Sequence, residues 1–112
     1  RRLVQHPTYT IGATYADIRE LTESGAYVEH SLCMFIPESR FQYYPSEELK
    51  AVIEAGGTER TILGSDLGQI NNPTPVSGFR AVIRLCIELG FDDPTIRRLV
   101  GGNAAELIGL QP

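Results

Sequence analysis

Short apolar segments rich in β-branched residues alternate along the chain with longer segments in which apolar residues recur every three or four positions. The first pattern predicts β-strands and the second predicts amphipathic helices. Each helical segment ends at a glycine, which is typical of a helix C-terminus. The predicted strand–helix units span about residues 3–24, 26–56 and 61–90, and closing helices follow over 93–110.

The helical pattern is clearest in the third unit. Phe79, Val82, Ile83 and Cys86 lie at positions i, i+3, i+4 and i+7, and Gly90 follows them. This spacing puts four apolar side chains on one face of a helix, so we expect that face to be buried.

In the closing segment, the pair Gly101-Gly102 is expected to end one short helix. Asn103, followed three residues later by Glu106, has the spacing of an N-terminal cap. We therefore expect a last short helix to begin at Asn103.

Strands that alternate with helices predict an α/β fold with a parallel sheet and right-handed crossovers. Three parallel strands alone leave both sheet edges open. We therefore expect the chain to be a single domain or a fragment, completed either by N-terminal strands or by other copies in a homo-oligomer. The chain opens with Arg1-Arg2 and its only methionine is Met34, which favours a piece of a longer protein.

Side chains alternate between the two faces of a strand, so the pattern also predicts directions. Asp66 shares a face with Ile62 and Gly64 in the third strand. On the second strand, Glu29 and Ser31 are expected on the face opposite to His30. If the sheet curves into a barrel, we expect Asp66, Glu29 and Ser31 inside it and His30 turned away from the site. By the same alternation, we expect the His6 side chain on the same face of the first strand as Val4.

Composition narrows the class of protein. The chain has 112 residues, of which 42% are hydrophobic and 21% charged, and its net charge is −4. These values fit one globular domain and do not favour binding to nucleic acid or to an anionic membrane. Neither a membrane-spanning segment nor a signal peptide is predicted. Cys33 and Cys86 lie in apolar contexts without metal-site spacing, so we expect buried, reduced thiols and a cytoplasmic location.

The most informative stretch is Thr61–Pro73, where a β-branched run leads into Gly-Ser-Asp and then into a polar loop. Active sites of α/β proteins lie beyond the carboxyl ends of parallel strands, which makes Asp66 a candidate catalytic residue. The same Gly-Ser-Asp also occurs as a simple turn. His6, at the end of the first predicted strand, is a second candidate.

An imidazole and a carboxylate suit a divalent metal such as zinc, and they equally suit a general acid–base pair. Two residues do not complete a catalytic zinc site, which needs three protein ligands. A third ligand would come from Glu29 or from outside this sequence.

Four features together resemble the last three strand–helix units of a metal-dependent hydrolase of the amidohydrolase superfamily, close to an uncharacterised amidohydrolase-like branch. They are a strand ending in His6-Pro7, a second strand ending in Glu29-His30-Ser31, the stretch Ile62–Gln69 with Asn72-Pro73, and the tail Gly102–Leu110, which is similar to the closing helix of that superfamily.

The resemblance implies the C-terminal portion of a TIM-barrel-like (β/α)8 fold and a small-molecule substrate. It implies that Asp66 binds a metal and takes a proton from the attacking water, and that His6 ligates the metal or polarises the substrate carbonyl. Ser31, Gln69 and Asn71 are implied as substrate-binding residues. The implied cofactor is a divalent metal, zinc in the first instance, with manganese or iron as alternatives.

The chain lacks the His-x-His motif that the superfamily carries on its first strand. We therefore expect an incomplete metal site in this chain alone. One alternative is a non-catalytic barrel fragment or assembly module. Another is a flavodoxin-like signalling or binding domain with Asp66 as phosphoacceptor. That domain would need an acidic pair after the first strand, where Leu3 to Pro7 offers none.

Overall fold

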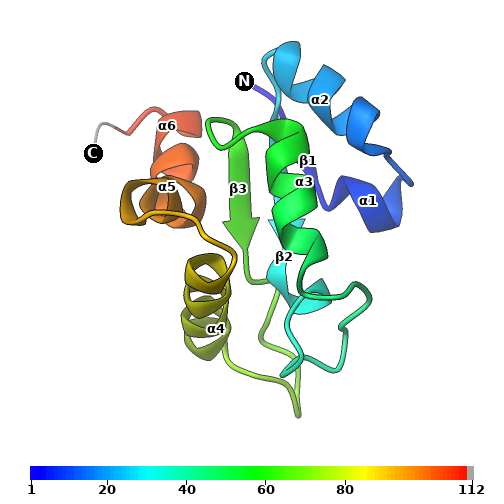
Figure 1. Ribbon diagram of the computed structural model, residues 1–112, viewed down its shortest axis with the longest axis vertical. Helices are drawn as coiled ribbons and strands as arrows, with labels where there is room; N and C mark the ends of the chain where they lie inside the picture. The colour runs from blue at the N-terminus through cyan, green and yellow to red at the C-terminus, as the bar shows by residue number, and fades with distance from the viewer. Residues whose placement is uncertain (111–112) are drawn as a thin grey trace.

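The computed structural model describes residues 1–110 and contains a parallel three-stranded sheet (Figure 1). The strands are β1 (Leu3–Gln5), β2 (Tyr27–Ser31) and β3 (Thr61–Gly64), in the spatial order β1-β2-β3. In the register of the sheet, Gln5 pairs with Glu29, and Ser31 pairs with Gly64. The predicted α/β class with parallel strands is therefore confirmed.

Helices connect and follow the strands, as the hydrophobic pattern predicts. The main ones are α2, α3 and α4, and shorter turns lie between and after them. Their bounds are α1 (Pro7–Thr10), α2 (Tyr15–Glu23), the 3₁₀ turn η1 (Leu32–Met34), α3 (Glu48–Gly56), α4 (Pro75–Glu88), α5 (Asp93–Arg97), the π-helical turn η2 (Arg98–Gly102) and α6 (Asn103–Leu107).

Local sequence determines where α2 begins and ends. The Thr14 hydroxyl accepts a hydrogen bond from the Asp17 backbone N–H at 3.1 Å, and the Asp17 carboxylate accepts one from the Thr14 N–H at 2.8 Å. This reciprocal capping box satisfies two backbone donors that the first helical turn leaves free. At the other end, Gly25 has φ +95°, a left-handed conformation that glycine adopts without strain and that turns the chain into β2.

The hydrophobic core lies on one face of the sheet. Val4 and Val28 pack with α2 and α3 in a smaller cluster, and Leu63 packs with α3, α4 and the closing helices in a larger one. The opposite face carries Gln5 paired with Glu29, and Ser31 paired with Gly64. The sheet thus has one apolar, helix-covered face and one face with polar side chains.

The closing segment differs from the prediction. Gly101-Gly102 do not end a helix, because the chain passes through them as the π-helical turn η2 directly into α6. Asn103 does not cap α6. Its side chain is buried and donates to the backbone carbonyls of Thr58 and Thr61, at 2.7 Å each. The acceptors that this amide satisfies lie at the start of β3, so the closing helices are tied to the edge of the sheet.

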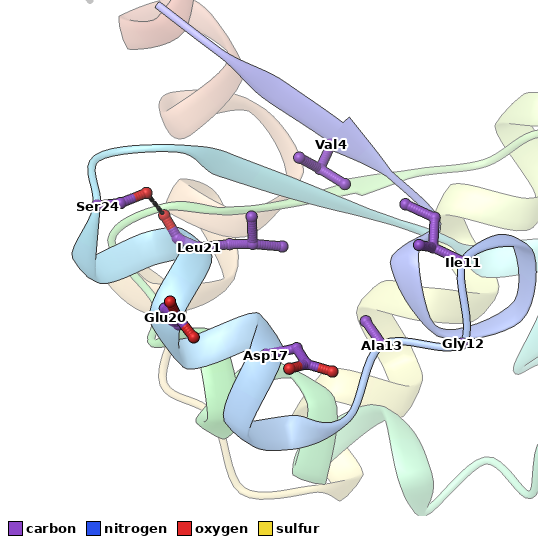
Figure 2. A pocket seen from close by; sticks show the side chains of 8 residues that line it. All are labelled: Val4, Ile11, Gly12, Ala13, Asp17, Glu20, Leu21 and Ser24. Atoms are coloured by element: carbon purple, nitrogen blue, oxygen red, sulfur yellow. Dashed lines mark hydrogen bonds between the residues drawn. The ribbon is translucent and has the colours of Figure 1, made fainter.

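The two edges of the sheet therefore differ. The β3 edge contacts η2 and α6. At the β1 edge, Leu3 is 39% exposed and β2 is the only neighbouring strand within residues 1–110. A hollow of about 440 Å³ lies between β1 and α2 and is lined mainly by Val4, Ile11, Ala13 and Leu21 (Figure 2). No helix within residues 1–110 has the length and apolar character needed to cross a bilayer.

Candidate functional site

The polar face of the sheet ends in a cleft at the carboxyl ends of all three strands. Its volume is about 230 Å³. Glu29, His6 and Asp66 are its ionisable groups. The full lining consists of Gln5, His6, Glu29, Ser31, Gly64, Ser65 and Asp66. This is the position at which parallel-sheet proteins bind ligands, and we call it the strand-end cleft.

Left-handed backbone conformations place two of these side chains. His6 has φ 31° and Asp66 has φ 50°, values that residues with a Cβ rarely adopt. Because His6 leaves the extended conformation, its side chain does not lie on the same face of the sheet as Val4, which strict alternation predicts. It lines the strand-end cleft instead. The prediction for His6's face was wrong for this reason. Strained backbone of this kind concentrates at functional sites.

The position of His6 is fixed from two sides. Its backbone N–H donates to the Glu29 carbonyl at 2.6 Å, which continues the β1–β2 ladder by one residue. Its ring Nδ1 lies 2.6 Å from the Thr10 hydroxyl. With Nδ1 engaged by Thr10 of α1, Nε2 is the ring nitrogen left for a ligand.

Glu29 contributes a second carboxylate beside Asp66. Its side chain lies across Gly64, so closely that a Cβ on Gly64 would stand 2.9 Å from the carboxylate. Burial raises the pKa of Glu29 above its ordinary value, and the negative charge of Asp66 raises it further. His6 acts in the opposite direction on the same pKa. The Glu29 carboxylate therefore lies within electrostatic reach of both Asp66 and His6.

Ser31 and His30 lie on opposite faces of β2, as alternation predicts. Ser31 is 1% exposed and lines the strand-end cleft, and its hydroxyl has no hydrogen-bond partner among residues 1–110. His30 is also 1% exposed, but it points into the core beside Phe35, with 6.5 Å between the ring centroids. Burial lowers the pKa of His30 to about 4, so the ring is neutral at physiological pH and has no place in the cleft.

A second cleft of about 430 Å³ adjoins the first, and Asp66 lines both. Tyr9 and Tyr43 contribute to its wall, with ring centroids 4.8 Å apart in an edge-to-face arrangement. Arg40 also lines it, and its guanidinium lies 5.1 Å from the centre of the Phe41 ring. We call this the aromatic cleft.

Gln69 and Asn71 have different positions. Gln69 lines the aromatic cleft, but its amide donates to the Asp66 carbonyl at 2.7 Å and accepts from Asn72 at 3.0 Å. These bonds hold the loop after β3 in shape. Asn71 is exposed, with φ 59°, and lines neither cleft.

The cysteines lie apart from each other and are unbridged. Cys86 is buried in the larger core cluster, where burial raises its pKa to about 11. Cys33 lines the aromatic cleft, and its pKa is raised by burial and then by the charge of Asp66. Both thiols are therefore protonated near neutral pH and are poor nucleophiles.

Sequence reasoning missed the aromatic cleft. Tyr9, Arg40 and Tyr43 come from connecting segments whose folding the hydrophobic pattern does not specify. Glu29 was considered only as a third metal ligand. A glycine at position 64, where regular alternation expects a side chain, was the available indication that something crosses the strand there.

The side chains of the strand-end cleft include possible metal ligands. His6, Glu29 and Asp66 offer an imidazole and two carboxylates, the ligand types that zinc and manganese accept. Yet within residues 1–110 no group of three His, Cys, Asp or Glu side chains is arranged closely enough to hold a metal ion. The chemical types of these side chains suit a divalent metal, but further ligands would be needed to complete its coordination.

Comparisons with protein-family models, with curated proteins and with solved structures find no match to this chain.

Proposed function

We propose that the chain forms the last three strand–helix units of a TIM-barrel-like (β/α)8 metal-dependent hydrolase of the amidohydrolase type, acting on a small molecule. In this proposal the polar face of the sheet lines the inside of the barrel. Asp66 and His6 contribute to a divalent-metal site that ligands outside residues 1–110 complete.

The observation that carries the proposal is the strand-end cleft itself. Three parallel strands bring His6, Glu29 and Asp66 together at their carboxyl ends, on the face that the hydrophobic core leaves free. Two of these residues have left-handed backbone conformations.

A divalent cation bound there would lower the pKa of a bound water from 15.7 to about 7 and so supply hydroxide at neutral pH. Asp66 is exposed at the mouth of the cleft and accepts the proton that the attacking water loses. His6, whose Nδ1 is held by Thr10, has only Nε2 free. Nε2 would serve either as a metal ligand or, as an N–H donor, to stabilise the charge that develops on the substrate carbonyl oxygen.

Manganese binding tests this proposal on the chain as it stands. Mn²⁺ is paramagnetic and broadens the amide signals close to it, so we expect selective broadening around Asp66 and His6. The substitution Asp66→Asn should abolish that broadening. Asp93→Asn is the matched control, because Asp93 is an exposed carboxylate on α5 whose contact with Arg97 is also exposed. Two side chains with water in the remaining positions can bind a divalent ion weakly. Broadening that persists in Asp66→Asn, or none at this cleft at millimolar Mn²⁺, would therefore contradict the metal site.

A second candidate function is that of a non-catalytic assembly module. The free edge of β1 and the apolar hollow beside it favour this function, since a further strand and helix would cover both (Figure 2). Under this hypothesis the chain associates with other strands but binds no Mn²⁺ at Asp66.

A further inference from the structure

The strand-end cleft has more hydrogen-bond acceptors than donors. Glu29 and Asp66 bring two carboxylates into a space of about 230 Å³. The Ser31 hydroxyl, 1% exposed, also lines this space without a partner within residues 1–110. Native proteins satisfy nearly all their buried polar groups, so this hydroxyl is available to a group that enters the cleft.

The position of Glu29 is a built feature of the sheet. Its carboxylate occupies the space over Gly64, where any larger residue would contact it at 2.9 Å. The Glu29–Ser31 spacing places both side chains on one face of β2, and Ser31 pairs in register with Gly64. The glutamate and the hydroxyl are therefore directed to the same small volume.

The aromatic cleft indicates how a ligand would be oriented. It shares Asp66 with the strand-end cleft, so one molecule can occupy both. Tyr9 and Tyr43 offer apolar ring surface there, whereas Arg40 adds a positive charge. The aromatic cleft thus has one charge of each sign, whereas the strand-end cleft has two carboxylates, so a cationic group is favoured at the acidic end.

We infer that the strand-end cleft binds the ammonium group of a small amine-bearing substrate. Glu29 and Ser31 accept its hydrogen bonds, and Tyr9 and Tyr43 contact its apolar body. The ammonium provides N–H donors and a complementary positive charge to the Glu29 carboxylate. This inference rests on the proposed function in taking the cleft as a substrate site, but it does not require a metal.

Benzylamine is a suitable probe, because it joins an ammonium group to one aromatic ring. Benzyl alcohol has nearly the same shape without the charge and serves as the matched control compound. Binding is measured from amide chemical shifts of the ¹⁵N-labelled chain at neutral pH. We expect benzylamine to shift signals of β2, of β3 and of the Tyr9 and Tyr43 segments, and to bind at least tenfold more tightly than benzyl alcohol.

Three variants test the role of Glu29. Glu29→Gln should weaken benzylamine binding about tenfold, the loss expected for one hydrogen bond between charged groups. Gly64→Ala keeps every charge but displaces the Glu29 carboxylate, so it should weaken binding as well. Glu59→Gln makes the same charge change at an exposed residue just before β3 and should leave binding unchanged.

Equal binding of the two compounds would overturn the inference, and so would an unchanged benzylamine affinity in both Glu29→Gln and Gly64→Ala. If Glu29→Gln loses its folded amide spectrum, Gly64→Ala decides alone. The Mn²⁺ experiment is independent of these results. If the wild-type chain shows no Mn²⁺ broadening at the cleft but binds benzylamine, the result counts against the metal site only. If it shows Mn²⁺ broadening but does not prefer benzylamine, the result counts against the ammonium site only.

Discussion

His30 should make the protein sensitive to acid through a group that lies outside the candidate site. The ring is 1% exposed, and both of its nitrogens lack hydrogen-bond partners among residues 1–110. In the unfolded chain His30 titrates near its ordinary pKa of 6.5, whereas burial lowers the folded-state pKa to about 4. Between these two pKa values the unfolded state binds a proton at His30 and the folded state does not. The free energy of unfolding therefore falls as the pH decreases through this range.

The magnitude follows from the size of the pKa shift. At about 1.4 kcal/mol per pKa unit, a decrease from 6.5 to about 4 corresponds to about 3 kcal/mol of unfolding free energy. This is a large share of the 5–15 kcal/mol that is usual for a domain. The loss should begin near pH 6.5 and be complete near pH 4.

Urea unfolding followed by circular dichroism, repeated from pH 7 to pH 4, measures this dependence. The matched variant is His30→Leu, which has no titrating ring. It should be more stable than the wild type at pH 7 by about 1 kcal/mol or more, because it removes two unsatisfied polar atoms. It should also lose most of the decline between pH 6.5 and pH 4.

Three carboxylates with shifted pKa values also change the stability with pH, but either outside this pH range or in the opposite direction. Asp17 and Asp92 cap helices and have lowered pKa values, so their stabilising effect is lost only as the pH falls below about 4. Glu29 has a raised pKa, so its contribution favours the folded state as the pH falls through that raised pKa. If the stability of the wild type and of His30→Leu falls equally between pH 6.5 and pH 4, the reasoning is refuted.

Substitutions at two further positions test the fold. Asn103→Ala removes both hydrogen bonds to the carbonyls of Thr58 and Thr61 and should lower the unfolding free energy by about 2–4 kcal/mol, as measured by urea unfolding. Asn103→Asp keeps the size but loses the donor, and stability close to the wild type in that variant would contradict the role assigned to the amide. Thr14→Ala breaks the capping box with Asp17 and should cost about 1 kcal/mol, measured as a decrease in Tm. Thr14→Ser retains the cap and should restore most of it.

Periodicity was sufficient to predict the strands, the main helices and the parallel arrangement. These elements depend on local patterns, such as the apolar stripe of α4 with its buried Val82 and Cys86. The closing segment could not be predicted in the same way. Gly101-Gly102 resemble a helix end, yet packing against β3 keeps the chain helical through them. Tertiary contact outweighed local preference at these two residues.

The candidate site was only partly accessible from the sequence. Asp66 lines the cleft from two residues beyond β3, where its left-handed backbone has left the regular period of the strand. Alternation correctly placed Glu29 and Ser31 on one face, because both lie on β2. It failed at His6, where a left-handed residue breaks the period of two. The contribution of Tyr43 was invisible as well, since its position depends on how the connection between β2 and α3 folds back toward the sheet.

In the proposed site, His6, Glu29 and Asp66 act together at the carboxyl ends of the strands. The most direct test is the pKa of Glu29, measured from its side-chain carboxyl ¹³C shift as a function of pH. We predict a pKa above the ordinary 4.5, which falls in Asp66→Asn and rises in His6→Gln. A Glu29 pKa that neither substitution changes would show that the three groups do not share a site and would contradict the account.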